Sequence, residues 1–482
     1  MVVERPLLVM SGGTQMRVYN QLRVSKYEYE YPLIEKWCKE NLVLPNPDYA
    51  KKARMGFWLG NTPKTLSLYE INGDDLVLPY GCFNEILRLC PLMAEVRMDF
   101  VEHERIDYGC TLPLYDYQQK ALDALVECGK GILQSPAGSG KTQIGIATAV
   151  ALGARTLWLC HTLDLVKQSK SRAEQYMSPS LTGTITEGRV QIGKAITFAT
   201  VQTMCNLDLS QYRDVWDCII VDECHRVAGT PTAMTQFSKV LNALAARHKY
   251  GLSATVHRAD GMIAATYALL GGIAYQVPEE SVKDKIMTVS VLPRATHQGL
   301  SREFLDTDGT IIYAKLVNFL ADRYPRNNLI VADLVANRDH YNLILSDRLT
   351  HLETLMNRLP PDLRKQAVMI DGKMTTKKAK ALREQAIEEM RQGRKRYLFA
   401  TYSLAKEGLD IPRLDRLYLT TPQKDYAVIT QSIGRIARTF EGKGEPIAYD
   451  YVDDGIQYLV RSYKKRCTTY RKAGCKFIDG EN

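Results

Sequence analysis

Three short segments of the sequence carry residue types that suit the binding and hydrolysis of a nucleoside triphosphate. They are residues 135–142, residues 222–225 and residues 431–438. The first combines glycines with a lysine and a threonine, the second begins with an acidic pair, and the third ends in two arginines three positions apart. Their order along the chain predicts one phosphate-transfer site assembled from distant parts of the sequence.

The first segment, Ser-Pro-Ala-Gly-Ser-Gly-Lys-Thr, is typical of a phosphate-binding loop, although Ser135 stands where the pattern usually has a glycine. Backbone N–H groups of such a turn at a helix N-terminus form an anion site. We expect Lys141 to reach the terminal phosphates and the Thr142 hydroxyl to bind Mg²⁺, so ATP and Mg²⁺ are the predicted cofactors. Three small residues are expected to form the turn: Gly138, Ser139 and Gly140.

The acidic pair, Asp222 and Glu223, follows an apolar run at residues 218–221 that reads as a buried strand. In a parallel sheet this ending brings carboxylates to the edge where ligands bind. Asp222 is predicted to hold Mg²⁺, directly or through water, and Glu223 to polarise the attacking water. An acidic pair that only caps the next helix is the alternative, and the presence of Lys141 disfavours it.

The third segment, Gln-Ser-Ile-Gly-Arg-Ile-Ala-Arg, places two fixed positive charges on a predicted helix. The forked donors of arginine match phosphoryl oxygens, so an arginine from another lobe makes hydrolysis depend on closure. We expect Arg438 to be the arginine finger and Arg435 its partner on the γ-phosphate, with Gln431 in the same catalytic set. A helix whose arginines face solvent is the alternative, and Gln431 and Gly434 disfavour it.

Further polar residues could connect this site to its surroundings. Gln118, at the start of a predicted helix, could present its amide to the adenine edge. Ser253 and Thr255 follow a predicted strand and could bond the magnesium-site carboxylates, which would couple the lobes; an ordinary polar turn is the alternative. Gly408 permits close backbone approach, and with Asp410 it lies in a segment that could face both the nucleotide and a nucleic-acid track.

The elements that position these residues alternate between short β-rich runs and helix-like segments from about residue 114 onward. This pattern predicts parallel sheets covered by helices on both faces. The predicted strands of one sheet are residues 132–134, 156–160, 196–200, 218–221 and 250–253. The predicted strands of a second sheet are residues 343–346, 368–370, 397–400, 417–420 and 447–451. The expected fold class is α/β, with two tandem doubly wound parallel-sheet domains and an N-terminal accessory domain. The predicted boundaries are 1–108 for the accessory domain, possibly DNA-binding, 109–285 for the ATP-binding domain and 286–482 for the C-terminal domain.

Two basic regions are candidates for contact with nucleic acid. Residues 51–58 place two lysines and an arginine beside Phe57 and Trp58, which suits phosphate contacts with base stacking. A solvated helix face followed by core aromatics is the alternative. Residues 461–476 carry seven basic residues and no acidic one, interleaved with two tyrosines. We expect this second region to be the better candidate, and a basic helix end that is simply solvent-exposed surface is the alternative.

Composition sets broad limits on the class of protein. A chain of 482 residues with 45% hydrophobic residues can form several sizeable cores, and a net charge of +9 permits a polyanionic partner. The first residues lack the pattern of a signal peptide, and the longest apolar window is too short for a membrane span, so a cytoplasmic location is expected. Eleven cysteines without a Cys-x-x-Cys pair indicate reduced, packed thiols rather than a zinc site.

Taken in order, these segments resemble the DEAD/DEAH-like helicases of superfamily 2 over residues 110–455. The resemblance implies that the two doubly wound domains are RecA-like. Asp-Glu-Cys-His together with residues 251–261 is similar to the branch that contains type III restriction subunits, the xeroderma group B helicase and phage recombination helicases. Pro-Asn-Pro-x-Tyr followed by Lys51-Lys52 resembles phage and prophage members. Tyr115 departs from the branch, which commonly has arginine there, so the resemblance implies adenine selectivity less firmly than hydrolysis.

The resemblance implies an ATP-dependent DNA helicase or translocase that moves on or remodels duplex or branched DNA, with roles in repair or recombination. His161, Thr203 and Thr401 lie in segments that in this family flank the nucleic-acid track. An RNA helicase, or an ATP-gated clamp that binds nucleic acid without unwinding it, are the alternatives. Since no nuclease constellation is recognisable, a separate nuclease or recombination factor could be a protein partner.

Overall fold

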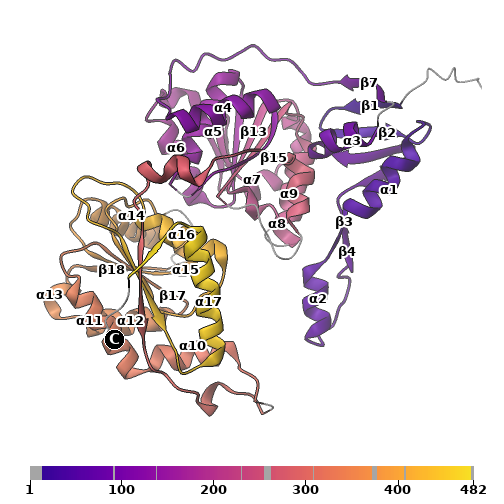
Figure 1. Ribbon diagram of the computed structural model, residues 1–482. Helices are drawn as coiled ribbons and strands as arrows, with labels where there is room; N and C mark the ends of the chain where they lie inside the picture. The colour runs from indigo at the N-terminus through magenta and orange to yellow at the C-terminus, as the bar shows by residue number, and fades with distance from the viewer. Residues whose placement is uncertain are drawn as a thin grey trace, which may run out of the picture. The chain divides into compact units, whose positions relative to one another are not determined.

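The computed structural model describes residues 14–90, 93–136, 138–228, 231–254, 262–307, 309–371, 377–406 and 409–478. The chain divides into two compact units. The first runs to Glu279, apart from residues 137–139, and the second begins at Glu280. Each unit is built around one large sheet, and the first also contains a smaller sheet near the N-terminus (Figure 1).

The large sheet of the first unit has eight strands in the order β11-β10-β12-β9-β13-β14-β8-β15. Neighbouring strands run parallel except in the hairpin of β10 and β11. Its central strands are buried along their whole length, as expected for a parallel sheet covered on both faces. The strands are β8 (Lys130–Gln134), β9 (Thr156–Cys160), β10 (Thr182–Thr186), β11 (Arg189–Gln191), β12 (Ile196–Thr200), β13 (Cys218–Asp222), β14 (His248–Ser253) and β15 (Ile273–Gln276).

Helices cover this sheet, and the one that follows the predicted phosphate loop packs closely on it. A Cβ atom built at Gly145 would lie 2.8 Å from side-chain atoms of both Leu252 and Trp158. A glycine is therefore needed where this helix meets the strands. The helices are α4 (Asp116–Cys128), α5 (Lys141–Leu152), α6 (Leu163–Ala173), α7 (Val201–Cys205), α8 (Pro231–Ala243) and α9 (Ile263–Leu270).

The sheet of the second unit has seven parallel strands in the order β18-β19-β17-β20-β21-β16-β22. The strands are β16 (Ser290–Ala295), β17 (Asn342–Ser346), β18 (Ala367–Ile370), β19 (Tyr397–Thr401), β20 (Arg416–Leu419), β21 (Ile447–Val452) and β22 (Lys476–Phe477). The helices are α10 (Tyr313–Asp322), α11 (Tyr324–Ala336), α12 (Leu349–Arg358), α13 (Pro361–Arg364), α14 (Lys377–Arg391), α15 (Tyr402–Lys406), α16 (Tyr426–Ile436) and α17 (Gln457–Lys472). Two parallel sheets flanked by helices confirm the predicted α/β class.

The N-terminal region forms a sheet of five strands in the order β5-β6-β2-β1-β7, in which only β1 and β7 run parallel. We call residues 14–98 the accessory domain. Its sheet and helices are β1 (Thr14–Val18), β2 (Gln21–Ser25), β5 (Glu70–Asn72), β6 (Asp75–Pro79), β7 (Met93–Met98), α1 (Tyr31–Asn41) and α3 (Phe83–Leu89).

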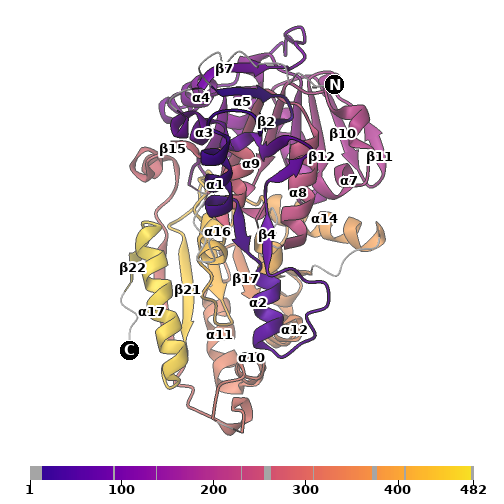
Figure 2. The same cartoon turned by 90° about the vertical axis from the view of Figure 1, so that its right-hand side faces the viewer.

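A small projection leaves the accessory domain after α1. Strands β3 (Val43–Pro45) and β4 (Thr65–Ser67) pair antiparallel, and α2 (Pro47–Arg54) lies at their far end (Figure 2). We call residues 43–67 the arm. Leu42, Leu44 and Leu68 at its base are buried in the core of the accessory domain, so the arm begins and ends on a fixed support.

The accessory domain shares a hydrophobic core with the first large-sheet domain. Met262, Ala265 and Ala268, in and beside α9, belong to the same buried cluster as the apolar residues of β1, β2 and β6. The approach is close enough that a Cβ atom built at Gly81 would lie 2.4 Å from the carbonyl oxygen of Ala268. Tyr80 Oη also donates to the carbonyl of Arg247 at 3.0 Å. These contacts make the two domains one folded body.

Two lysines are buried where these domains meet. Lys130 Nζ lies 3.6 Å from the centre of the Phe83 ring, and Lys249 Nζ donates to the carbonyl of Leu241 at 2.6 Å. Burial lowers the pKa of each lysine to about 7. Each charge therefore lies in a desolvated position beside aromatic or carbonyl groups.

The basic C-terminal region is partly a core element, which corrects one expectation. It forms most of α17, whose Tyr470 is fully buried and whose Arg466 makes a buried two-pronged ion pair with Asp450 at 2.8 Å for each contact. Lys464, Lys465 and other basic residues face solvent on the same helix. Tyr470 cannot stack on bases, because it packs against the second sheet.

All eleven cysteines lie in the described ranges and are free thiols, seven of them buried, which confirms the predicted packed thiols. Among the helices within those ranges, none is both long and apolar enough to cross a membrane.

Candidate nucleotide site

The predicted nucleotide-binding residues of the first unit lie at one edge of its sheet. Strands β13, β14 and β8 are adjacent and parallel, so their carboxyl ends lie side by side. These strands end at Asp222, Ser253 and Gln134, respectively. The backbone N–H of Ser135 donates to the carbonyl of Ser253 at 2.9 Å. The beginning of the loop is therefore tied to the strand next to Asp222.

The loop between β8 and α5 has the backbone of an anion-binding turn. Gly138 and Gly140 have φ angles of +84° and +81°, in the left-handed region that glycine tolerates, and Ser139 between them is buried. Gly140 is the N-cap of α5, which begins with Lys141 and Thr142. The first N–H groups of a helix have no partner within it, so this loop offers donors and the positive end of a helix dipole to a phosphate.

Asp222 occupies a desolvated position that suits a carboxylate that holds a metal. Burial and the negative charge of Glu223 raise its pKa, while the positive charge of Lys141 acts in the opposite direction. Ser169 Oγ donates to Asp222 Oδ2 at 3.1 Å, and the Glu223 N–H donates to Oδ1 at 3.0 Å. A bound cation would favour the ionised carboxylate, and Thr142 offers a second oxygen, so this donor set fits the Mg²⁺ of a bound nucleotide.

Glu223, the predicted water-polarising residue, has an unusual backbone conformation. Its φ angle is +50°, which costs a residue with a side chain about 1 kcal/mol or more. Such strained residues cluster at functional sites, although Glu187 and His297 outside this site also have positive φ angles. Glu223 Oε2 lies 3.3 Å from His225 Nδ1, and that same nitrogen lies 3.0 Å from Ser253 Oγ. A polar link therefore runs from the carboxylate to the end of β14 through His225.

His225 is a site residue that the sequence reasoning did not single out. Ser253 was expected to bond the carboxylates directly, whereas the imidazole of His225 lies between Ser253 Oγ and the Glu223 carboxylate. The spacing of the histidine two residues after Glu223 was the available signal. It could not identify the partner, because Ser253 comes from a different strand.

Gln118, predicted to contact adenine, packs against the phosphate loop. It is 2% exposed, and its Oε1 accepts the backbone N–H of Tyr115 at 3.0 Å. A Cβ atom built at Gly140 would lie 2.4 Å from Gln118 Nε2. The amide therefore closes the first turn of α4 and constrains the loop glycine, and a contact with adenine stays a prediction.

In the second unit, the predicted arginines gather around residues 409–412. Arg435 Nη1 donates to the carbonyl of Leu409 at 3.0 Å, and Arg438 forms an ion pair with the carboxylate of Asp410. Arg391 Nε donates to the carbonyl of Asp410 at 2.7 Å. Asp410, predicted to face the nucleotide, thus contacts the predicted finger.

Lys443 connects these two segments. Its Nζ donates to the carbonyls of Pro412 at 3.0 Å, of Ile436 at 2.7 Å and of Arg438 at 2.7 Å, so it joins residue 412 to the end of α16. Burial lowers its pKa to about 8, while the charge of Asp415 raises it and that of Arg438 lowers it. Lys443 was not predicted from the sequence, because its partners are backbone atoms of separate segments.

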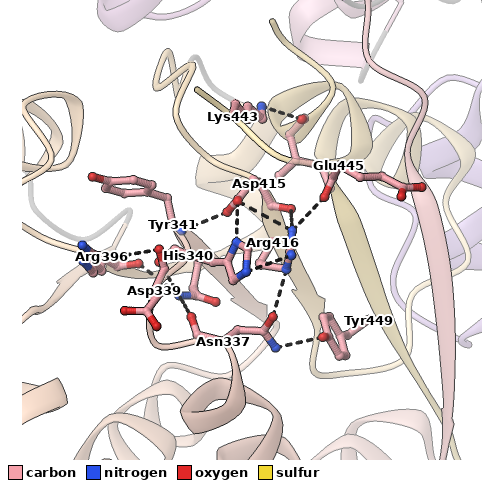
Figure 3. A network of polar contacts seen from close by, with 12 residues as sticks. Asn337, Asp339, His340, Tyr341, Arg396, Asp415, Arg416, Lys443, Glu445 and Tyr449 are labelled. Carbon is pink, nitrogen blue, oxygen red and sulfur yellow. Dashed lines mark hydrogen bonds and ion pairs between the residues drawn. The ribbon is translucent and has the colours of Figure 1, made fainter. Parts of the chain in front are cut away.

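A polar network supports this region from the starts of the strands (Figure 3). Asp415 accepts the backbone N–H of Tyr341 at 2.9 Å and contacts His340 Nδ1 at 2.7 Å. Arg416 donates to the Asn337 side chain at 2.9 Å. These bonds fix the beginning of β20 relative to the residues before β17.

The other predicted residues have different surroundings. Both ring nitrogens of His161 are buried without a hydrogen-bond partner among the described residues, which does not favour a direct contact of this ring with nucleic acid. Burial lowers its pKa to about 4. Thr203 pairs with Thr200 at 2.9 Å, and Thr401, at the end of β19, pairs with Ser403 at 2.9 Å.

Gln431 Oε1, on α16, is a buried acceptor with no partner among the described residues. Thr255 and Gly408 lie outside the described residues, so their predicted roles stay predictions. Within the described ranges, the structure therefore brings together Lys141, Asp222, Glu223 and Ser253 in the first unit, and Asp410, Arg435 and Arg438 in the second.

Two family models match the chain. The model of the type III restriction enzyme, res subunit, matches residues 111–258, and that of the helicase conserved C-terminal domain matches residues 327–440. Together they cover more than half of the chain, and each spans the candidate residues of one large sheet.

Relatives are found among viral and cellular helicases. Probable helicase D10 of Escherichia phage T5 is 26% identical over 349 residues, which cover 72% of this chain and 73% of that protein. Putative ATP-dependent RNA helicase L396 of Acanthamoeba polyphaga mimivirus is 26% identical over 421 residues, or 84% and 76% of the two chains. DNA 3′-5′ helicase XPB of Mycobacterium tuberculosis is 28% identical over 179 residues, or 35% and 31%.

Solved structures share the fold at low identity. S. cerevisiae Dbp5 bound to RNA and ADP BeF3 gives a TM-score of 0.54 at 16% identity and covers 76% of this chain and 89% of that chain. The fragment of a putative HsdR subunit of a type I restriction enzyme from Vibrio vulnificus YJ016 gives 0.54 at 18% identity, with 74% and 68% covered. The matched families, the relatives and the two RecA-like sheets show that this chain belongs to superfamily 2 of the helicases, in the branch of type III restriction subunits and XPB-like proteins.

Proposed function

We propose that this protein is an ATP-dependent DNA helicase or translocase, which couples ATP hydrolysis to movement on, or remodelling of, duplex or branched DNA. The observation that carries the proposal is the sheet edge in the first unit. There, the charge of Lys141 acts on buried Asp222, and Glu223 is connected through His225 to the end of β14.

Each residue has a role in this proposal. Bound Mg-ATP supplies the phosphoryl group that is transferred to water. Lys141 and the loop N–H groups bind its phosphates, Asp222 and Thr142 orient the metal, and Glu223 accepts a proton from the attacking water. Arg438 and Arg435 stabilise the charge that develops on the γ-phosphate, once Arg438 exchanges Asp410 for phosphate oxygen.

DNA is favoured over RNA by the branch to which the chain belongs, and the name of the XPB relative states DNA. An RNA helicase is the second candidate, because the mimivirus relative is named as one. An ATPase assay with single-stranded, duplex, forked and four-way DNA, and with RNA at the same salt concentration, tests both. Stronger stimulation by DNA supports the proposal, and stimulation by RNA alone would contradict it.

Salt dependence provides an independent test of the nucleic-acid contact. Backbone phosphate contacts release counterions, so raising the salt concentration should weaken DNA binding and ATPase stimulation in parallel. Titrations of both quantities between about 50 and 200 mM salt would measure this. A stimulation that does not change with salt would count against phosphate-based binding.

A further inference from the structure

The arm carries a concentration of exposed apolar side chains. Trp58 is 88% exposed, Phe57 59% and Met55 50%. In contrast, Trp158 and Trp216 are buried. Large aromatic side chains that project into solvent together mark an interaction surface more often than chance exposure does.

The arm holds this shape without a core of its own. None of residues 47–67 is buried, so packing does not account for the apolar side chains at its tip. Asn46 caps α2 by accepting the Asp48 N–H at 3.0 Å, and Lys52 Nζ donates to Thr62 Oγ1 at 2.7 Å. Gly56, with φ of +65°, ends the helix and leads directly into the two aromatic residues. The core-aromatic alternative considered from the sequence is therefore wrong.

Charge on the arm is strongly one-sided. Its basic residues are Lys51, Lys52, Arg54 and Lys64, and Asp48 is its one acidic residue. Lys51 and Arg54 are exposed in the last turn of α2, immediately before the aromatic pair. Cations beside solvent-facing rings suit a ligand that offers phosphates and flat aromatic faces together.

We propose that the arm binds unpaired nucleic acid, with bases stacked on Trp58 and Phe57 and phosphates against Lys51 and Arg54. An unpaired strand is the occupant because bases within a duplex are already stacked on one another and cannot offer their faces to a ring. The inference rests on the proposed function. It adds that the arm, which lies outside both large sheets, holds the single-stranded part of a branched substrate.

Substitution of the tryptophan in the whole chain tests the stacking. Trp58→Ala should weaken binding of oligo(dT) about five- to hundredfold, because the loss of one stacked aromatic ring lowers the affinity by this factor. Trp58→Phe keeps an aromatic ring and should retain most of the affinity. Basal ATPase without nucleic acid should not change in either variant. Tyr29→Ala is the matched control, since Tyr29 is 73% exposed on the same domain but lies outside the arm. Oligo(U) serves as the RNA comparison.

The basic residues predict a different signature. Arg54→Gln should reduce the salt dependence of oligo(dT) binding by about one unit of slope, while Trp58→Ala leaves that slope unchanged. Iodide should quench Trp58 fluorescence in the free protein, and saturating oligo(dT) should protect it.

Three results would overturn the inference. The first is that Trp58→Ala binds oligo(dT) as tightly as the parent protein does. The second is that saturating oligo(dT) does not protect Trp58 from iodide. The third is that iodide does not quench Trp58 in the free protein, which would mean that a protein surface covers it. Failure of the proposed function would look different, because the parent protein would then bind neither oligo(dT) nor duplex DNA.

Discussion

Glu223 combines a left-handed backbone with a carboxylate oxygen that lies 3.3 Å from His225 Nδ1. Glu223→Gln should keep the phosphate loop and retain ATP binding, while hydrolysis falls by roughly two orders of magnitude or more, because the amide cannot accept the proton of the water. Single-turnover hydrolysis measured beside nucleotide affinity checks this. Normal turnover in the variant would remove Glu223 from the catalytic role.

Arg438 is held by Asp410 in the described structure. If it is the finger, Arg438→Ala should lower ATP hydrolysis by about a thousandfold or more with little change in nucleotide affinity, because the lost charge acts mainly on the transition state. The control is Arg461→Ala, at an exposed arginine of α17 in the same unit. If both variants hydrolyse ATP at the parent rate, another residue performs this function.

At the scale of residues, type and spacing were enough to predict where the lysine loop and the acidic pair lie, and their catalytic roles stay predictions. The lysine loop and the acidic pair needed only a strand before them to be placed at a sheet edge. His225 and Lys443 were missed because their roles depend on partners from other segments, a hydroxyl of β14 and three backbone carbonyls. Burial, which makes Tyr470 a core residue, is likewise a property of the packed structure.

At the scale of elements, the end of α16 depends on one ammonium group. Protonated Lys443 has a donor for each of its three carbonyl partners, whereas the neutral amine has only two. Because its pKa is lowered to about 8, ATPase activity should fall as pH rises through this value. Lys443→Arg stays charged and should lose this alkaline decline, and Lys443→Met should have low activity at every pH.

The measurement is a pH profile of kcat from about pH 6.5 to 9.5. Lys464→Met, at an exposed lysine of α17, is the matched control and should follow the parent profile. An alkaline decline that persists unchanged in Lys443→Arg would show that another group titrates.

Elements with a clear apolar run were predictable, and those without one were not. The central strands β9, β12, β13, β17 and β19 coincide with predicted strands, because buried parallel strands are continuous apolar segments. β16 was missed, since Pro293 within it disfavours an interior strand when judged locally. The accessory sheet gave no readable pattern, because its strands are short and two of its pairings, β2 with β6 and β1 with β7, join strands far apart in the sequence.

At the scale of the whole molecule, the buried lysines predict how stability depends on pH. The pKa of Lys249 is lowered to about 7 in the folded protein from its usual value of 10.5. Between these values the unfolded chain binds more protons, so the contribution of this lysine to the free energy of unfolding increases as pH rises. Below about pH 7 both states are protonated and the contribution is constant.

Lys249→Met should remove this dependence. The difference in Tm between the parent protein and the variant should change in favour of the parent as pH rises from about 7 to 9. Thermal unfolding of the first unit at several pH values, with exposed Lys167→Met as the control, would measure it. Parallel Tm curves for parent and Lys249→Met would contradict a lowered pKa.

The contact of Gly81 with the backbone of α9 limits how the accessory domain can be exchanged in evolution and whether it can be expressed separately. A motor that carried its N-terminal region on a tether could exchange it for another by simple recombination, and each piece could be expressed alone. Here, a cut at the junction would leave Met262, Ala265 and Ala268 facing water. Internal packing does not constrain the sequence of the projecting tip, whereas the domain beneath it must be inherited together with the ATP-binding lobe.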